Sequence, residues 1–192
     1  MLKDKGTINL STKRLLLRRF RETDTLYMYK NWASNPNVTR YVTWFSHKSV
    51  AETQNIIGNW IKEYSLSHVY QWAIELKEIG EPIGSIGVVR MDEDKQSCEI
   101  GYCIGEAFWN KGYTSEALKV IIQFLFEEVG FNRIAACHDI RNPNSGKVME
   151  KGGMQYEGTM REVGFTKEGD KLTLSYYSIL KSDWLNEKTQ TS

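Results

Sequence analysis

The sequence predicts a single mixed α/β domain, and three observations support this prediction. The first is length, because 192 residues suffice for one substantial core and are too few for two. The second is a change of hydrophobic period, from helical spacing over residues 49–64 to strand alternation from residue 69 onward. The third is a strongly apolar helix within residues 108–126 that is followed by further strands.

Each element follows from the local pattern of side chains. Apolar residues recur every three or four positions in the predicted helices, and the second helix also begins with a capping box formed by Ser49 and Glu52. Strands are expected where apolar and polar residues alternate between turn residues. In chain order we expect strand 14–20, helices 23–34 and 49–64, strands 69–76, 83–92 and 97–105, the helix within 108–126, strand 133–139, a short helix after Pro143, and strands 154–162 and 171–180. The domain should span residues 12–184, with residues 185–192 as a polar, frayed C-terminal tail.

Composition excludes several classes of function. Hydrophobic residues make up 41% and charged residues 26%, as in soluble globular domains, and the net charge of +1 gives no electrostatic basis for binding nucleic acid or an acidic membrane. The N-terminus has no secretory h-region, and no apolar run is long enough to cross a membrane. Cys98, Cys103 and Cys137 are odd in number and lack metal-ligand spacing, so we expect reduced thiols, a cytoplasmic location and no metal.

The stretch FWNKGYTSEALKVIIQFLF, residues 108–126, joins a polar front edge to an apolar helix. Lys111 supplies a positive charge, Gly112 permits a sharp turn and a close backbone approach, and Thr114 and Ser115 supply hydroxyl groups. Because the first turn of a helix has free N–H groups and a positive dipole end, the combination predicts a phosphate or pyrophosphate site. The same residues also suit an ordinary turn with capping hydroxyls, and this stretch alone leaves both interpretations open.

Three stretches together resemble the GNAT superfamily of acetyl-CoA-dependent N-acetyltransferases. WNKGYTSEA departs from the Gln/Arg-x-x-Gly-x-Gly/Ala signature at Trp109 and Thr114, and both departures are typical of the Rim-type, ribosomal-protein N-acetyltransferase branch. STKRLLLRRFRETD resembles the opening strand and first helix of that branch. RNPNSGKVMEKGGM resembles its N-x-x-S segment and the short helix that follows.

The resemblance implies a fold and an activity. The fold would be a curved mixed sheet of about six to seven strands with helices on both faces, in which the fourth strand (97–105) and the fifth (133–139) splay apart. The activity would be transfer of an acetyl group from acetyl-CoA, as co-substrate and without a metal, to a primary amine. The acetyl-pantetheine arm would enter the gap between the splayed strands.

The resemblance also implies roles for individual residues. Glu99, in the fourth strand, would act as the general base, and Ser145 would protonate the leaving thiolate, with Tyr102 and Tyr156 as alternative acids. The expected cofactor-binding residues are Tyr102, Cys103, Ile104, Lys111, Gly112, Tyr113, Thr114, Ser115, Asn142 and Ser145. The alternative interpretations are that Glu99 is a solvated strand residue and that the Asn142–Ser145 segment is an ordinary helix-capping turn. For Glu99 a function is favoured, because Glu is depleted in strands and the neighbouring Cys98 and Ile100 are apolar.

Several alternatives stay open at this point. The acceptor amine could belong to the N-terminus of a ribosomal or other protein, to a polyamine or to an antibiotic. A catalytically idle acyl-CoA-binding or regulatory module is the alternative from a different class, and the oligomeric state, a homodimer included, is also open. The acceptor region would draw on the first helices and the last hairpin, where no role is assigned to Trp32, Arg40, Tyr41, Trp44, Phe45 or the loop between Glu162 and Lys171.

Overall fold

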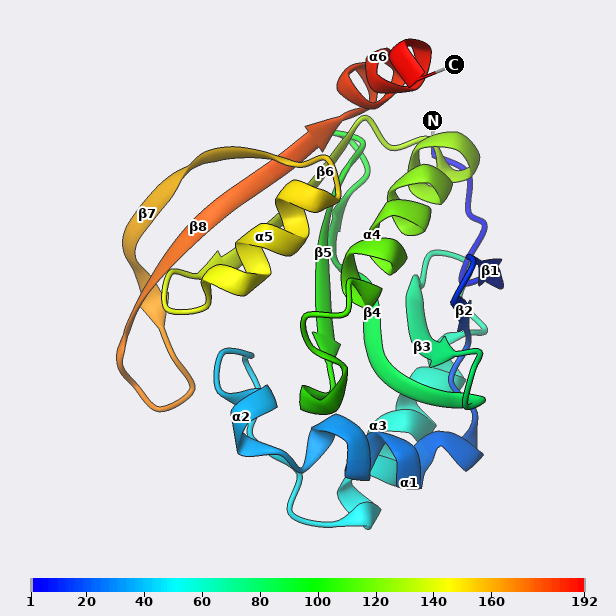
Figure 1. Cartoon of the computed structure of the whole chain (residues 1–192), viewed down its shortest axis with the longest axis vertical. Coiled ribbons are helices and arrows are strands. Elements are labelled where there is room, and N and C mark those ends of the chain that lie inside the picture. The colour runs from blue at the N-terminus through cyan, green and yellow to red at the C-terminus, as the bar shows by residue number, and fades with distance from the viewer. Residues whose placement is uncertain (1, 192) are drawn as a thin grey trace.

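A computed structural model describes residues 2–191 of the chain, and Figure 1 shows one curved sheet with helices packed around it. The sheet strands are β1 (Leu10–Ser11), β2 (Leu15–Arg18), β3 (Gln71–Leu76), β4 (Glu81–Asp92), β5 (Ser97–Ile104), β6 (Arg133–Asp139), β7 (Gln155–Phe165) and β8 (Lys171–Leu180). The α-helices are α1 (Thr25–Met28), α2 (Pro36–Thr39), α3 (Val50–Glu63), α4 (Tyr113–Phe124), α5 (Pro143–Lys151) and α6 (Lys181–Thr191).

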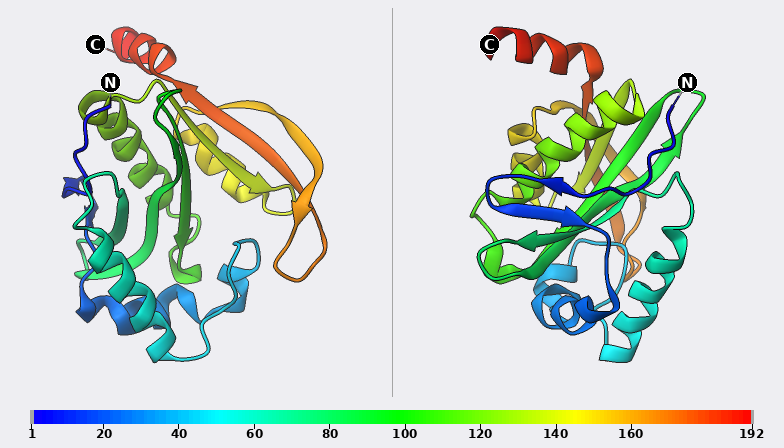
Figure 2. Two further views of the ribbon diagram at one scale, coloured as in Figure 1. Left: turned by 180° about the vertical axis from the view of Figure 1, so that it is seen from behind. Right: turned by 90° about the vertical axis from the view of Figure 1, so that its right-hand side faces the viewer.

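Within the described residues the sheet has eight strands in the order β1-β2-β3-β4-β5-β6-β8-β7. Strands β5 and β6 are paired in parallel, whereas the other neighbouring strands are antiparallel. The β5–β6 pairing begins with Ser97 opposite Arg133 and ends with Glu99 opposite Ala135. Beyond Glu99 the two strands diverge, as the two views in Figure 2 also show. The splayed fourth and fifth strands expected from the sequence are therefore confirmed.

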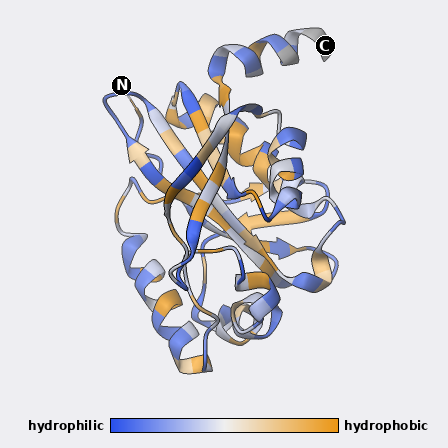
Figure 3. Cartoon of the chain, turned by 90° about the vertical axis from the view of Figure 1, so that its left-hand side faces the viewer, coloured by the Kyte–Doolittle hydropathy of each residue, from blue (hydrophilic) through white to orange (hydrophobic). Residues whose placement is uncertain are grey.

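The core lies on both faces of the sheet because side chains alternate along each strand. On β3, Trp72 and Ile74 pack in the larger cluster with α4, while Ala73 between them belongs to the cluster of α1 and α3. Helix α4 contributes Leu118 and Ile121, both fully buried. Figure 3 shows the alternation of polar and apolar residues along the outer strands. Helices thus pack on both faces of the sheet. The sheet opens between β5 and β6, in the gap beyond Glu99.

The structure differs from the sequence prediction in three elements. The pair Leu10–Ser11 forms a short strand against Leu16 and Leu17, so the sheet has eight strands in residues 2–191 rather than six or seven. Helix α2 begins at Pro36, where Asn35 accepts a hydrogen bond from the N–H of Asn37 at 2.9 Å. Both elements are too short to produce a periodic sequence pattern.

The third difference is at the C-terminal end, where residues 181–191 are helical instead of a frayed tail. The Asp183 carboxylate accepts the N–H of Leu180 at 3.2 Å, next to the first turn of α6. The ring of Trp184 packs at 5.7 Å from that of Phe126, and the Lys188 ammonium lies 4.1 Å from the Trp184 ring centroid. These contacts with the domain stabilise a helix that its polar composition does not predict. In the described part of the chain, no helix is long and apolar enough to cross a membrane.

Candidate active site

A cavity of about 420 Å³ lies where β5 and β6 part. Its walls come from the end of β5, the beginnings of α4 and α5, and the α2 region. Most of the site residues predicted from the sequence line this cavity, namely Tyr102, Cys103, Ile104, Gly112, Tyr113, Thr114, Ser115, Asn142 and Ser145. Glu99 and Lys111 are the exceptions. The tertiary structure thus brings three distant stretches of sequence to one place.

Gly112 is the N-cap of α4 and has a left-handed backbone, with φ of 76°. A side chain there would be strained by this φ, although a Cβ atom would meet only the Arg14 Nη2 atom, at 3.6 Å. The backbone at the start of α4 is therefore open to a ligand. The next three residues carry N–H groups that the helix itself does not pair, and Thr114 and Ser115 are buried beside them. This arrangement can bind an anion.

Arg14 and Glu116 hold this helix start in place, and sequence reasoning did not single them out. Arg14 on the chain just before β2 donates through Nε to Glu116 Oε2 at 2.7 Å and through Nη1 to the Lys111 carbonyl at 2.9 Å. Its guanidinium also lies 4.5 Å from the ring centroid of Tyr113. Thr12 donates to Glu116 Oε1 at 2.5 Å. Both residues lay within stretches that carried the family resemblance, but nothing in the sequence showed that they pair.

Burial disfavours the charged form of Glu116, but hydrogen bonds from Thr12 and Arg14 and the nearby guanidinium outweigh it. The pKa of Glu116 is therefore lowered below its ordinary value of 4.5. The carboxylate stays ionised at neutral pH and accepts hydrogen bonds from Arg14 Nε and from the Thr12 hydroxyl. The first turn of α4 is thus tied to the sheet by a charged pair.

Tyr102 and Ser145 meet across the gap between the parted strands. The phenol oxygen of Tyr102 lies 2.9 Å from the Ser145 carbonyl oxygen and 2.9 Å from Ser145 Oγ. Burial raises the pKa of Tyr102 well above its usual range, which the hydrogen bond to Ser145 only partly offsets, so the phenol remains neutral. Asn142 is the N-cap of α5, yet its side chain makes no capping hydrogen bond. Its amide therefore remains available to the cavity that it lines.

Glu99 lies outside the cavity, on the opposite face of the sheet. Its Oε1 atom is 3.5 Å from the Cys137 sulfur, which donates to it, and its Oε2 atom is 3.9 Å from Arg90 Nη1. Burial raises the pKa of Cys137 to about 12, and the neighbouring carboxylate adds to the shift, so the thiol stays protonated. Glu99 is also the last residue of β5 that pairs with β6. Its carboxylate is therefore near the closed end of the gap.

Lys111 has a supporting position at the helix start. Its ammonium lies 5.7 Å from the ring centroid of Phe108, and its carbonyl accepts the hydrogen bond from Arg14. The side chain is exposed and does not line the cavity. The Lys111 backbone carbonyl, and not its ammonium group, is therefore the part that contacts the helix start, through Arg14.

The charged residues that line the cavity are Arg141, Lys147 and Lys151, with no carboxylate among them. Arg141 pairs with the buried Asp139, its Nη2 atom lying 2.5 Å from Oδ2. The cavity thus combines an open helix start, three cations and an apolar wall from β5. These features fit a long ligand with several phosphates and an uncharged arm, as acetyl-CoA has.

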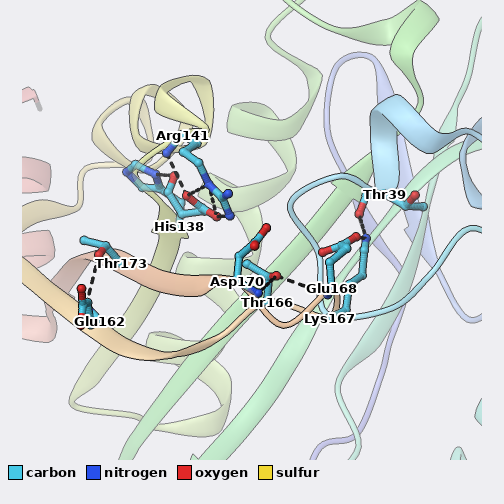
Figure 4. A network of polar contacts seen from close by, with 10 residues as sticks. Thr39, His138, Arg141, Glu162, Thr166, Lys167, Glu168, Asp170 and Thr173 are labelled. Carbon is cyan, nitrogen blue, oxygen red and sulfur yellow. Dashed lines mark hydrogen bonds and ion pairs between the residues drawn. The ribbon is translucent and has the colours of Figure 1, made fainter.

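The hairpin of β7 and β8 reaches back to the segment after α2 (Figure 4). The Lys167 ammonium at the hairpin tip donates to the Thr39 carbonyl and, at 3.0 Å, to the Trp44 carbonyl. Its side chain is only 7% exposed, and the ammonium also lies 5.6 Å from the Phe45 ring centroid. This contact joins two of the regions in which the acceptor site was expected.

The sequence-family model of the acetyltransferase (GNAT) domain matches residues 14–155, which is most of the chain. The chain belongs to the GNAT acetyltransferase family. The resemblance found in the sequence is thereby confirmed, and with it the expectation of an acetyltransferase enzyme. GNAT enzymes use acetyl-CoA as the acetyl donor, which agrees with the chemistry of the cavity walls.

Known GNAT proteins show how far the similarity extends. An uncharacterised N-acetyltransferase of Bacillus licheniformis, p20, is 31% identical over 91% of this chain and 97% of its own length. The crystal structure of a GNAT-family acetyltransferase from Bacillus anthracis is 25% identical, covers 91% of this chain and 99% of its own, and has a TM-score of 0.80. A ribosomal-protein-serine acetyltransferase of Escherichia coli is 27% identical over 53% of this chain and 57% of its own.

Proposed function

We propose that this GNAT enzyme transfers the acetyl group of acetyl-CoA to the N-terminal amine of a protein. The observation that carries the proposal is the cavity at the β5–β6 gap, which has the open start of α4 in one wall and the Tyr102–Ser145 pair in another. An amine can approach the same gap from the other face of the sheet, where Glu99 lies.

The chain's own groups suggest how the donor is held. The first turn of α4, from Gly112 to Ser115, would bind the pyrophosphate through free N–H groups and hydroxyls. Beyond Glu99, β5 lacks a partner strand on its β6 side, so the backbone from Tyr102 to Ile104 can pair with the pantetheine arm like an added strand. The free amide of Asn142 would bind one of the amide groups in that arm.

Two side chains are candidates for the proton transfers. The amine must lose a proton before it can attack the thioester, and the Glu99 carboxylate at the closed end of the gap can accept it directly or through water. The departing sulfur must gain a proton, and Ser145 Oγ, in the cavity wall, can donate one. Holding both reactants in line would supply much of the remaining rate.

A protein N-terminus is the preferred acceptor because of the family branch that the sequence resembles. The similar Escherichia coli protein is named for acetylating a serine of a ribosomal protein. In this chain the acceptor would lie on the face that carries Glu99 and Tyr176. We extend the resemblance to this chain as a proposal about its substrate class.

A panel of acceptors tests the proposal. Purified protein with acetyl-CoA is offered N-terminal peptides that begin with serine or alanine, polyamines and an aminoglycoside, and release of free CoA thiol is measured. Acetylation of the peptide α-amine, verified by mass, is the expected result. Transfer confined to polyamines or the aminoglycoside would refute the protein substrate, and acetyl-CoA binding without transfer to any amine would indicate an idle binding module.

A further inference from the structure

The contact between Tyr102 and Ser145 spans the gap in the sheet. Tyr102 lies three residues beyond Glu99, where β5 no longer pairs with β6, and its phenol reaches the first turn of α5. The oxygen is 2.9 Å from both the carbonyl oxygen and Oγ of Ser145. The phenol thus contacts the one hydroxyl that the proposed reaction uses to protonate sulfur.

The contact between Tyr102 and Ser145 allows two arrangements of the hydroxyl protons. A phenol has one proton, and a carbonyl oxygen can only accept a hydrogen bond. When the Tyr102 hydroxyl donates to the Ser145 carbonyl, the Ser145 hydroxyl donates to the Tyr102 oxygen. Both hydroxyl protons are then used within the pair. When Tyr102 donates to Oγ instead, the serine proton is released and can point into the cavity. Rotation of two hydroxyl groups therefore converts a resting state into one in which Ser145 can donate to a ligand.

The surroundings favour this role for Tyr102. Burial keeps its phenol protonated, so it is always able to donate a hydrogen bond. A hydrogen bond accepted by Oγ polarises the serine O–H and helps it give up its proton. Gly146, the next residue after Ser145, packs closely on the sheet, because a Cβ there would lie 2.7 Å from His138 Nε2 and 3.1 Å from the Tyr177 oxygen. The backbone beside Ser145 therefore lies close to the His138 and Tyr177 side chains.

We propose that Tyr102 is a positioning residue that turns the Ser145 hydroxyl toward the leaving sulfur, an inference that rests on the proposed function. As the C–S bond breaks and the C–N bond forms, the Oγ–H bond of Ser145 breaks and an S–H bond forms. Tyr102 keeps its own proton and stabilises the developing serine alkoxide through its hydrogen bond. The proton that Glu99 took from the amine then passes through water to Ser145, which restores both residues.

A double-mutant cycle tests this inference, with Tyr102→Phe, Ser145→Ala and the double variant. Tyr102→Phe should lower kcat about tenfold, as for loss of one hydrogen bond made in the transition state, with little change in the KM for acetyl-CoA. In the Ser145→Ala background the same change should have no further effect. Ser145→Thr, which retains a hydroxyl, should keep most of the activity. Tyr27→Phe, on the exposed side of α1, is the matched control and should behave like the parent.

A second readout does not require turnover. The ultraviolet absorption of the thiolate of bound CoA is followed as a function of pH. Loss of the Tyr102 hydroxyl should raise the pKa of the bound thiol when Ser145 is present and leave it unchanged in the Ser145→Ala background. This separates orientation of the serine from a general effect on the cavity.

The outcomes are distinguishable. If Tyr102→Phe lowers kcat equally in the parent and in the Ser145→Ala background, Tyr102 has only a structural role. That result would overturn the inference while the proposed function stands. A parent protein that binds no CoA and acetylates no amine would overturn both. If Tyr102→Phe does not fold, Tyr102→Met, which fills the space without a donor, replaces it. Failure of both variants to fold would assign Tyr102 to stability alone.

Discussion

The Arg14 guanidinium and the Glu116 carboxylate join the N-terminal edge of β2 to the first turn of α4, with Nε 2.7 Å from Oε2. The same guanidinium donates to the Lys111 carbonyl, directly before the left-handed Gly112. The Arg14 side chain therefore binds residues on both sides of Gly112, at which the turn before α4 is made. This relationship makes the proposed phosphate site a preorganised one, and it leads to the first predictions.

Gly112→Asp should strongly weaken acetyl-CoA binding while the fold is retained. The change adds a side chain at a backbone φ of 76° and places a negative charge where the pyrophosphate is expected. Calorimetric titration with acetyl-CoA measures the effect. The matched control is Gly80→Asp, which alters a glycine of similar φ, 65°, with nothing within 4 Å of its Cβ position. Unchanged affinity in a folded Gly112→Asp protein would exclude the phosphate site.

Glu116→Gln should weaken acetyl-CoA binding about tenfold, because the loss of the charge-assisted bonds to Arg14 loosens the turn at Lys111. The variant changes no group that lines the cavity, so the effect must pass through Arg14. The control removes an exposed ion pair elsewhere, with Glu162→Gln breaking the pair to Lys171. Equal affinities of parent and Glu116→Gln would show that the turn is rigid without the pair.

The lowered pKa of Glu116 also predicts an effect of pH on stability. Because the folded-state pKa lies below the ordinary value of 4.5, the stabilisation is fully present above pH 4.5 and is lost as pH falls through the folded-state pKa. Glu116→Gln should therefore be less stable than the parent at neutral pH, and the difference should shrink below pH 4.5. Urea unfolding at a series of pH values measures it. A difference that stays constant into acid would contradict the assignment.

Glu99→Gln should bind acetyl-CoA nearly as well as the parent, because Glu99 does not line the cavity. Its turnover near neutral pH should fall by roughly 10²- to 10⁴-fold, the range for loss of a general base. The deficit should shrink at alkaline pH, where more of the amine is already neutral. Asp92→Asn, in the exposed pair with Lys95, is a suitable control. A parent-like rate and pH profile would make Glu99 structural.

Lys167→Met should lower stability by about 1–3 kcal/mol, because the Thr39 and Trp44 carbonyls lose their shared donor in a nearly buried place. The segment after α2 would then be released from the β7–β8 hairpin. Thermal unfolding measures the loss, with Lys171→Met at an exposed hairpin position as the control. Identical melting of parent and Lys167→Met would show that the contact does not stabilise the domain.

The mixed α/β class, the long helices and most of the strands could be predicted from the sequence, because these depend on the spacing of apolar residues along a few turns of chain. The sequence also predicted a phosphate site from Gly112 to Ser115, since a glycine at a helix start acts through its own backbone. The strand Leu10–Ser11 and the helix after Lys181 were missed. The first is too short to show a period and pairs with Leu16 and Leu17, and the second packs through Trp184 on the distant Phe126.

Which side chains meet could not be predicted from the sequence and follows from the folded structure. Glu99 and Tyr102 lie on one strand, yet the alternation of β5 places them on opposite faces of the sheet. Tyr102 reaches Ser145 because the pairing of β5 with β6 ends at Glu99. Arg14 meets Glu116 because β2 passes beside the start of α4. Such contacts depend on strand register and on where a sheet opens, which are set by the packing of the whole domain and not by any local pattern of residues.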